Sequence, residues 1–307
     1  MSQKGKWTYE VDKTKYILKN SDIVTDEGAI VKLDDASAEN IAMDIVNYKE
    51  AEEERKLIAK DYYTKKEGFE SELIKLYGKF HFGFYKSLPN ISKQYLFRFI
   101  YLCTYLKFND CRLMQKEDNG RYRFIYENEL QDLLKLGRAE YFNTKKELTN
   151  NNLIYIDDDK IIHINNKLAI NGNVGATKRD YIRIFNEAIR DIYENSLPKE
   201  HKRLYIFIEL LPYINYNLNV LCFNPKETTP ELIKPLTLED ITNILGIYKG
   251  NNKCKLQNLL LNTFVNGNKV MMINKDYKKE FYVVNPCIYY KGNRMEDITY
   301  LISMFKM

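Results

Sequence analysis

The stretch "LTLEDITNILGIYKGNNKCKLQNLLLN" (residues 236–262) has the pattern of two short helices separated by a glycine-marked turn. Thr237 and Asp240 stand three residues apart before an apolar run, the capping-box pattern of a helix start. Apolar residues then recur at helical spacing. We therefore expect helices over 238–245 and 251–263, which is the order of a helix-turn-helix unit.

The second of these helices has two different faces. Its predicted core face carries Leu256, Leu259, Leu260 and Thr263. Its opposite face is polar and lacks acidic residues; it carries Asn251, Cys254, Lys255, Asn258 and Asn262. In helix-turn-helix proteins the second helix enters the major groove, where Asn pairs with adenine and Lys reaches guanine or phosphate. The pattern favours DNA contact over the alternative, a solvated helix in a winged domain that binds protein.

Basic residues flank this helix on both sides. Lys249 and Lys253 stand at its start, where phosphate contacts commonly fix register. A hairpin predicted over 269–284 follows, and its tip carries Lys275, Lys278 and Lys279. A helix is expected upstream at 200–214 and a short strand near 235–237. Helix, strand, helix, turn, helix and two-stranded wing is the order of a winged helix-turn-helix domain.

The chain also repeats itself, in three ordered matches. "LFRFIYLCTYLKFN" (96–109) aligns with "LYIFIELLPYINYN" (204–217) at an offset of 108 residues, as in Tyr105 and Tyr213. Leu148 aligns with Leu259 at an offset of 111. "INNKLAINGN" (164–173) aligns with "VNPCIYYKGN" (284–293) at an offset of 120, and both end in Gly-Asn. The growing offsets indicate duplication with loop insertions, so residues 92–173 and 200–293 should share one fold.

The first repeat has the same predicted order of elements. We expect a helix at 92–107, an extended piece at 121–126, helices near 127–135 and 139–150, and a hairpin over 153–165. The third helix offers Arg138, Asn143 and Lys146 as DNA-contacting residues. The hairpin tip, however, is Asp157-Asp158-Asp159, which would repel phosphates. DNA reading by the helix alone and a protein-contact or dimerisation role both stay open for this repeat.

The remaining segments read as connections and an N-terminal extension. Residues 1–35 contain short strand candidates, and 36–65 and 67–77 read as two helices, the first strongly charged. The aromatic run Phe80, Phe82, Phe84 and Tyr85 is better explained by packing of a strand than by base stacking. Residues 177–196 have an apolar stripe of Ile182, Phe185, Ile189 and Ile192 and are interpreted as an amphipathic helix joining the repeats. The predicted boundaries are 1–88 for the extension, 89–175 and 199–307 for two winged domains, and 176–198 for the connecting helix.

Composition limits the class of protein. The 307 residues are 45% hydrophobic and 29% charged, and the net charge of +5 is modest, so affinity for nucleic acid must come from local patches. Five cysteines without a C-x-x-C pair favour neither a disulfide framework nor a zinc site. No targeting signal and no membrane-length apolar run is visible, so we expect a cytoplasmic protein without membrane contact.

Signatures of nucleic-acid enzymes are missing from the sequence. The three histidines, His81, His163 and His201, are far apart, which argues against a rolling-circle nickase. "HKRLY" does not match the His-x-x-Arg box of a tyrosine recombinase, and "GNVGATK" lacks the phosphate-loop spacing. We therefore expect no catalytic residues, no metal and no cofactor.

The order of elements over residues 90–307 resembles the tandem winged-helix replication initiators of plasmids and phages, and also DNA-binding regulatory proteins of phages. That resemblance implies an α+β, mainly α fold with two winged domains joined by a helix, and a second domain that is the main reader of double-stranded DNA. The turn "GIYKGNN" is longer than the simplest helix-turn-helix turn. The function expected is sequence-specific DNA binding that controls replication or transcription; the alternatives are a protein-interaction adaptor or a recombination protein. A homodimer through the N-terminal helix or the first winged domain is a further possible partner.

Overall fold

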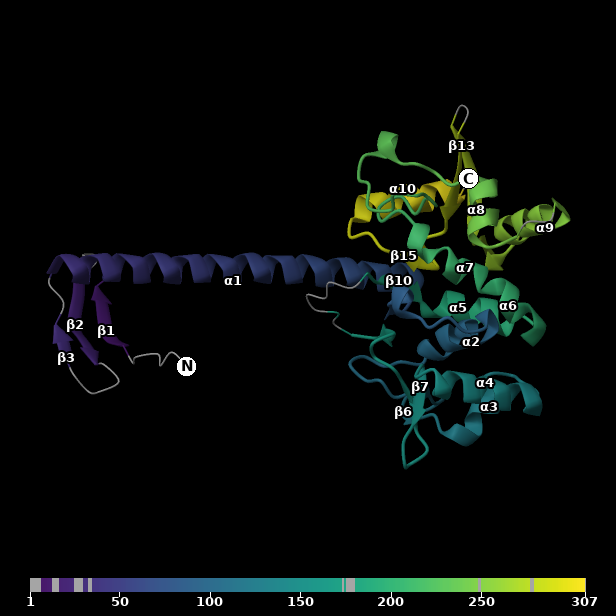
Figure 1. Cartoon of the computed structure of the whole chain (residues 1–307), viewed down its shortest axis with the longest axis horizontal. Helices are drawn as coiled ribbons and strands as arrows, with labels where there is room; N and C mark the ends of the chain where they lie inside the picture. Colours follow the sequence, from purple (N-terminus) through teal and green to yellow (C-terminus); the bar gives the residue numbers. More distant parts are fainter. Residues whose placement is uncertain are drawn as a thin grey trace. The chain divides into compact units, whose positions relative to one another are not determined.

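The computed structural model describes residues 7–12, 17–24, 30–32, 35–172, 174, 180–247, 250–276 and 279–306, with side chains from residue 47 onward except those at 49, 251, 276 and 279. The chain forms two compact units, Met1–Gly68 and Phe69–Met307. Helices alternate with small antiparallel sheets (Figure 1), so the fold is α+β at the coarse level predicted.

The first unit contains an antiparallel sheet of three strands, β1 (Trp7–Asp12), β2 (Ile17–Val24) and β3 (Ile30–Lys32). The strand candidates in this segment are thus confirmed. Helix α1 (Asp35–Tyr77) is continuous over 43 residues. The expected break between 65 and 67 is wrong, because a single interior glycine such as Gly68 costs only about 1 kcal/mol in a helix that is otherwise favourable.

In the second unit, the elements of the first repeat are β4 (Phe80–Gly83), η1 (Tyr85–Ser87), α2 (Lys93–Cys103), β5 (Met114–Lys116), β6 (Tyr122–Phe124), η2 (Glu127–Glu129), α3 (Leu130–Leu133), α4 (Arg138–Asn150), β7 (Ile154–Ile156), β8 (Ile162–Ile164) and β9 (Ala169–Ile170). The helices predicted at 92–107 and 139–150 and the hairpin at 153–165 are confirmed.

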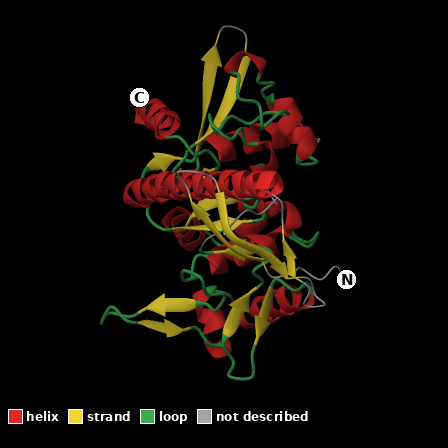
Figure 2. Cartoon of the chain, turned by 90° about the vertical axis from the view of Figure 1, so that its left-hand side faces the viewer, coloured by secondary structure: helices red, strands yellow, loops and turns green. Residues whose placement is uncertain are grey.

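The elements of the second repeat are β10 (Ile182–Phe185), α5 (Asn186–Glu194), η3 (Pro198–Glu200), α6 (His201–Leu204), α7 (Ile206–Glu209), η4 (Leu211–Tyr213), η5 (Pro230–Leu232), α8 (Leu238–Ile244), α9 (Gly250–Leu261), β11 (Phe264–Val265), β12 (Asn268–Lys269), β13 (Met271–Asp276), β14 (Lys279–Val284) and β15 (Tyr289–Tyr290), followed by α10 (Met295–Lys306). The β13–β14 hairpin is the long strand pair at the top of Figure 2. The single helix expected at 200–214 is divided into α6, α7 and η4, and Pro212, which has no N–H to donate, lies in η4, after the last α-helical residue, Glu209.

A four-stranded antiparallel sheet with the order β15-β10-β4-β9 joins the two repeats. Phe82 pairs with Arg183 at its centre. A two-fold axis through this pair would superpose the pair Gly83–Ile182 on the pair His81–Ile184. Each central strand also pairs with the closing strand of its own repeat, β4 with β9 and β10 with β15. The sheet therefore has approximate two-fold symmetry, and β4 corresponds to β10 at an offset of 101 residues.

Backbone hydrogen bonds repeat at the offsets read from the sequence. In the first repeat Leu113 N donates to Ile162 O, and in the second Leu221 N donates to Tyr282 O. The two donors are 108 residues apart and the two acceptors are 120 residues apart. Tyr126 N donates to the Glu129 carboxylate as Thr237 N donates to the Asp240 carboxylate, and the two bonds are 111 residues apart in the chain. Because these bonds lie throughout both segments, residues 92–173 and 200–293 share one hydrogen-bond framework, as the matches predict.

The interpretation of residues 177–196 as one connecting helix is wrong. Ile182 and Phe185 lie in strand β10, and only Ile189 and Ile192 lie in a helix, α5. All four residues of β10 are buried, because the strand is paired on both edges and covered on both faces. A short buried apolar run fits a central strand as well as a helix, and its pairing partners, being distant in sequence, decide between them.

Buried polar contacts hold the helices of the two repeats together. In the first repeat, the guanidinium of Arg98 donates to Glu140 at 2.6 Å and to Thr144 at 2.7 Å, which ties α2 to α4. The same group donates to Nδ1 of His201 in the second repeat at 3.1 Å. Tyr101 of α2 stacks on Tyr193 of α5, with ring centroids 3.8 Å apart. The helical core is therefore shared by both repeats.

The close packing around Gly292, at the end of the second repeat, can be tested by substitution. A Cβ at Gly292 would stand 2.7 Å from the carbonyl oxygen of Tyr216 and would also collide with the buried ring of Tyr290. We expect Gly292→Ala to lower the free energy of unfolding by about 1–3 kcal/mol, because a packed backbone has to move. Gly68→Ala, inside helix α1, is the control, since a Cβ there meets no atom within 4 Å. Urea unfolding of both variants measures the difference, and equal midpoints would contradict the assigned role of Gly292.

His81 predicts acid sensitivity of the fold. Its Nδ1 lies 2.7 Å from Oδ1 of Asn186, and its Nε2 is buried without a partner. Burial lowers the pKa of His81 to about 4. Since this folded-state pKa is depressed below the unfolded value of about 6.5, the stabilisation is complete above pH 6.5 and is lost as the pH falls toward 4.

The expected loss is about 1.4 kcal/mol per pH unit for each such histidine. His201, whose pKa burial lowers to about 3, adds to it. Urea unfolding between pH 7.5 and 4.5 measures the slope. His81→Gln should be less stable at pH 7.5 but should show a shallower slope, and an unchanged slope would rule out His81 as its source.

Candidate nucleic-acid interface

Helix α8 begins where the capping pattern places it. The hydroxyl of Thr237 accepts a hydrogen bond from Asp240 N at 3.2 Å, and the Asp240 carboxylate accepts one from Thr237 N at 2.8 Å. The helix ends at a left-handed glycine, Gly246, with φ of +69°. This capping box is confirmed, and it fixes the direction in which the chain leaves toward α9.

Helix α9 separates an apolar from a polar side as predicted. Leu256 and Leu260 are buried, and Leu259 is half-buried against the core. On the other side, Asn252, Cys254, Lys255, Asn258 and Asn262 are exposed. Asn252 was missed in the sequence analysis, although its spacing from Lys255 places it on the same side of the helix.

The polar side of α9 is notable for its lack of internal partners. Within the described part of the chain, the side chains of Asn252, Lys255, Asn258 and Asn262 take part in no hydrogen bond or ion pair. We refer to these four side chains as the α9 stripe. Each amide can donate and accept, and the lysine can donate three hydrogen bonds. The stripe is thus free to bind a ligand without breaking an internal contact.

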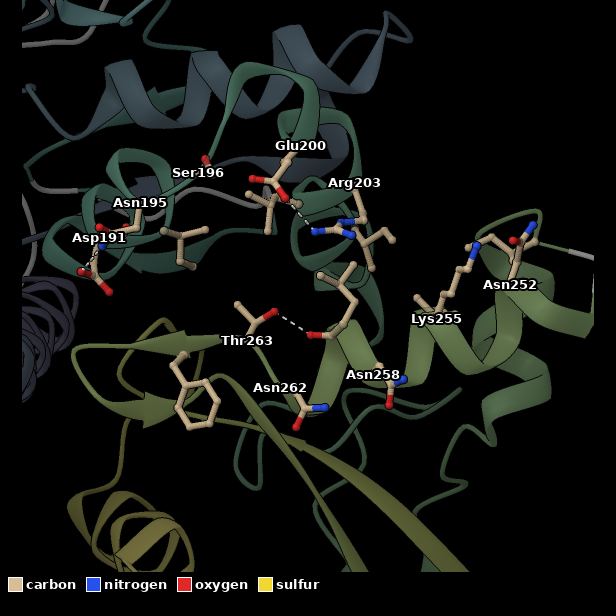
Figure 3. A pocket seen from close by; sticks show the side chains of 17 residues that line it. Asp191, Asn195, Ser196, Glu200, Arg203, Asn252, Lys255, Asn258, Asn262 and Thr263 are labelled. Atoms are coloured by element: carbon tan, nitrogen blue, oxygen red, sulfur yellow. Dashed lines mark hydrogen bonds and ion pairs between the residues drawn. The ribbon is translucent and has the colours of Figure 1, made fainter.

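The α9 stripe borders a cleft of about 710 Å³. Figure 3 shows α9 with its Asn and Lys side chains on one side of this cleft and the segment from α5 to α6 on the other. The facing wall carries polar residues, namely Asp191, Asn195, Ser196, Glu200 and Arg203. Apolar side chains of both walls line the rest: Ile192, Leu204, Ile206, Ile247, Leu256, Leu259 and Phe264.

The charged groups of the facing wall are already engaged. Asp191 accepts a hydrogen bond from Asn266 N at 2.9 Å, and Glu200 accepts one from Leu197 N at 2.9 Å. Arg203 donates to Glu200 at 3.0 Å. Together with Lys255 on α9, the cleft has two acidic and two basic side chains. Its readily available groups are therefore the amides and the lysine of the α9 stripe.

Other predicted contact residues of the second repeat are placed differently or lie outside the described residues. Lys253 is half-buried, 3.5 Å from Glu239, and Lys275 lies 2.9 Å from Glu280 on the adjacent strand. These acidic neighbours reduce the positive charge expected at the helix start and on the hairpin. Lys249 and Lys278 lie outside the described residues, and the side chains of Asn251 and Lys279 lie outside the described side chains.

In the first repeat, α4 also has an exposed polar side. Arg138, Asn143 and Lys146 are exposed on it, while Lys145 is held 2.6 Å from Glu127. At the β7–β8 turn, Asp157 accepts hydrogen bonds from Ile161 N and from the His163 ring at 2.8 Å. Asp157 of the predicted acidic tip therefore stabilises the hairpin, whereas Asp158 and Asp159 are exposed and carry its outward negative charge.

No protein-family model, no curated protein and no solved structure matches this chain. Among the helices that the structure describes, none combines the length and the apolar character needed to cross a bilayer.

The stability that the capping box gives helix α8 can be measured directly. Thr237→Ala should lower the free energy of unfolding by about 0.5–2 kcal/mol, because one backbone donor of α8 loses its acceptor. Thr228→Ala, at an exposed loop position, is the control and should be neutral. Urea unfolding compares the two variants. If they are equally stable, the Thr237 cap does not contribute to the stability of α8.

Proposed function

We propose that this chain is a sequence-specific double-stranded DNA-binding protein with two winged-helix domains, acting in control of plasmid or phage replication or transcription. The observation that carries the proposal is the α9 stripe, in which three exposed amides and one lysine without internal partners follow one side of a helix. Asn and Lys are side chains that read base edges in the major groove.

The order of elements supports this proposal. In each repeat a helix, α2 or α6–α7, precedes a helix pair joined by a short turn, and a hairpin follows. In a winged-helix domain the second helix of such a pair enters the groove, which assigns this role to α9 and to α4. Figure 1 draws α4 and α9 on opposite sides of the layer of α2, α5 and α6.

A protein-binding adaptor is the second candidate, and the cleft favours it. The cleft balances two acidic against two basic side chains and has an apolar lining, a character suited to a polypeptide rather than to a phosphate backbone. An adaptor would use the same α9 stripe to bind peptide groups. The two candidates differ in their response to salt and to duplex sequence.

Selected duplexes provide the first test. We expect Asn258→Ala to weaken binding to the preferred duplex by roughly 1–3 kcal/mol and binding to scrambled duplex very little, because a base contact is lost. Asn47→Ala, at an exposed position of α1, is the matched control. Competition binding measures both, after genomic pull-down has identified the preferred site. Equal losses on both duplexes would mean that α9 does not read bases.

Salt dependence provides the second test. The logarithm of affinity should fall with the logarithm of salt concentration by about 0.9 for each phosphate neutralised. Lys255→Gln should reduce this slope, and Lys146→Ala should have a smaller effect, because Asp158 and Asp159 oppose phosphates near α4. A salt-insensitive chain that leaves duplex DNA unbound would support the adaptor instead. A larger effect of Lys146→Ala would identify the first repeat as the main reader.

A further inference from the structure

A cluster of lysines around one tyrosine stands out in the first repeat. The Nζ atom of Lys79 donates to the hydroxyl of Tyr122 at 3.1 Å. The Nζ atom of Lys107 lies 4.3 Å from the centroid of the same ring. Lys116 is the cross-strand partner of Tyr122 in the β5–β6 hairpin. Residues from three separate parts of the chain thus meet at one phenol, and we call them the Tyr122 cluster.

The cluster is exposed and has no carboxylate of its own. All four side chains are exposed, with Tyr122 at 39%. Among the described residues, none of the three lysines forms an ion pair with an acidic group. The nearby Glu117 is 3.6 Å from Arg123 instead. The hydrogen bond from Lys79, together with the charges of Lys79, Lys116 and Lys107, lowers the pKa of Tyr122.

The position of the second repeat that corresponds to Lys79 carries a carboxylate instead of an ammonium group. By the register of β4 and β10, residue 79 corresponds to residue 180, and that residue is Asp180. Its carboxylate accepts hydrogen bonds from Lys86 and from the Tyr216 hydroxyl and lies 3.8 Å from Lys226. At position 180 a carboxylate therefore binds Tyr216 and Lys86, the latter from the first repeat, whereas the corresponding position of the first repeat is Lys79.

Three converging lysines repel one another unless an anion joins them. We propose that the Tyr122 cluster is a binding site for a phosphate group, presented by the backbone of a nucleic-acid strand. Lysine ammoniums and a phenol hydroxyl supply donors to phosphate oxygens. Phe108, next to Lys107, is 68% exposed and offers an aromatic face to a base, which free phosphate could not use. The site is separate from the α9 stripe and does not rest on its proposed role.

The full chain with ¹³C-labelled tyrosine rings gives the direct readout. At pH 7, the Tyr122 resonance, assigned from its loss in Tyr122→Phe, should shift saturably with inorganic phosphate and with a thymidine octanucleotide at constant ionic strength. The oligonucleotide should bind more tightly than inorganic phosphate. Equal or weaker oligonucleotide binding would overturn the assignment to nucleic acid, and an unmoved resonance would overturn the site altogether.

Matched lysine variants complete the experiment. Lys79→Gln and Lys107→Gln should each weaken the octanucleotide roughly three- to tenfold, as expected for one lost charge-assisted contact. Lys226→Gln removes the same charge beside Asp180 and should leave the affinity unchanged. An equal loss in all three variants would show a non-specific charge effect and would overturn the proposal. Because Asn258→Ala leaves the cluster intact, it should not alter the Tyr122 response even if α9 proves not to bind DNA.

Discussion

The pairing of β4 with β10 is the constraint on which the arrangement of the two repeats depends. These strands are separated by almost the whole first repeat, yet they form the centre of one sheet, and each carries the closing strand of its own repeat beside it. Arg183 sits at the centre, buried among Phe69, Phe80 and Phe82, and donates to the Gly292 carbonyl at 2.8 Å. Both terminal nitrogens of the Arg183 guanidinium are bonded and the group lies against aromatic rings, which offsets the cost of burying it, while its Nε has no partner. The two repeats are thereby joined through one sheet.

One framework carries two different surfaces. Backbone hydrogen bonds and closing strands repeat between the copies, but the side chains projecting from them do not. In the first repeat Arg98 ties α2 directly to α4, whereas in the second a cleft separates α9 from α6. Asp180 and Lys79 likewise reverse the charge at one corresponding position. Such divergence is possible because exposed positions contribute little to stability, so each repeat can acquire its own ligand.

The sequence predicted well what depends on neighbouring residues. The Thr237–Asp240 capping box, the two faces of α9 and both hairpins follow from short-range patterns, and the shared framework follows from the three offsets. Three features needed distant partners. Strand β10 resembles a helix until β4 and β15 are placed beside it, the wall facing α9 comes from a segment about sixty residues upstream, and the Tyr122 cluster joins Lys79, Lys107 and Tyr122 across separate elements. Short-range sequence patterns do not predict these contacts between distant segments.

The candidate surfaces also differ in what they demand of a ligand. The α9 stripe consists mainly of amides, which both donate and accept and therefore discriminate between partners by hydrogen-bond geometry. The Tyr122 cluster consists of ammoniums, which attract any phosphate in reach and carry no sequence information. A protein that uses both would recognise its site with one repeat and gain affinity with the other. Residues 79 and 180, which occupy corresponding positions in the two repeats, carry opposite charges and so give the two repeats different surfaces.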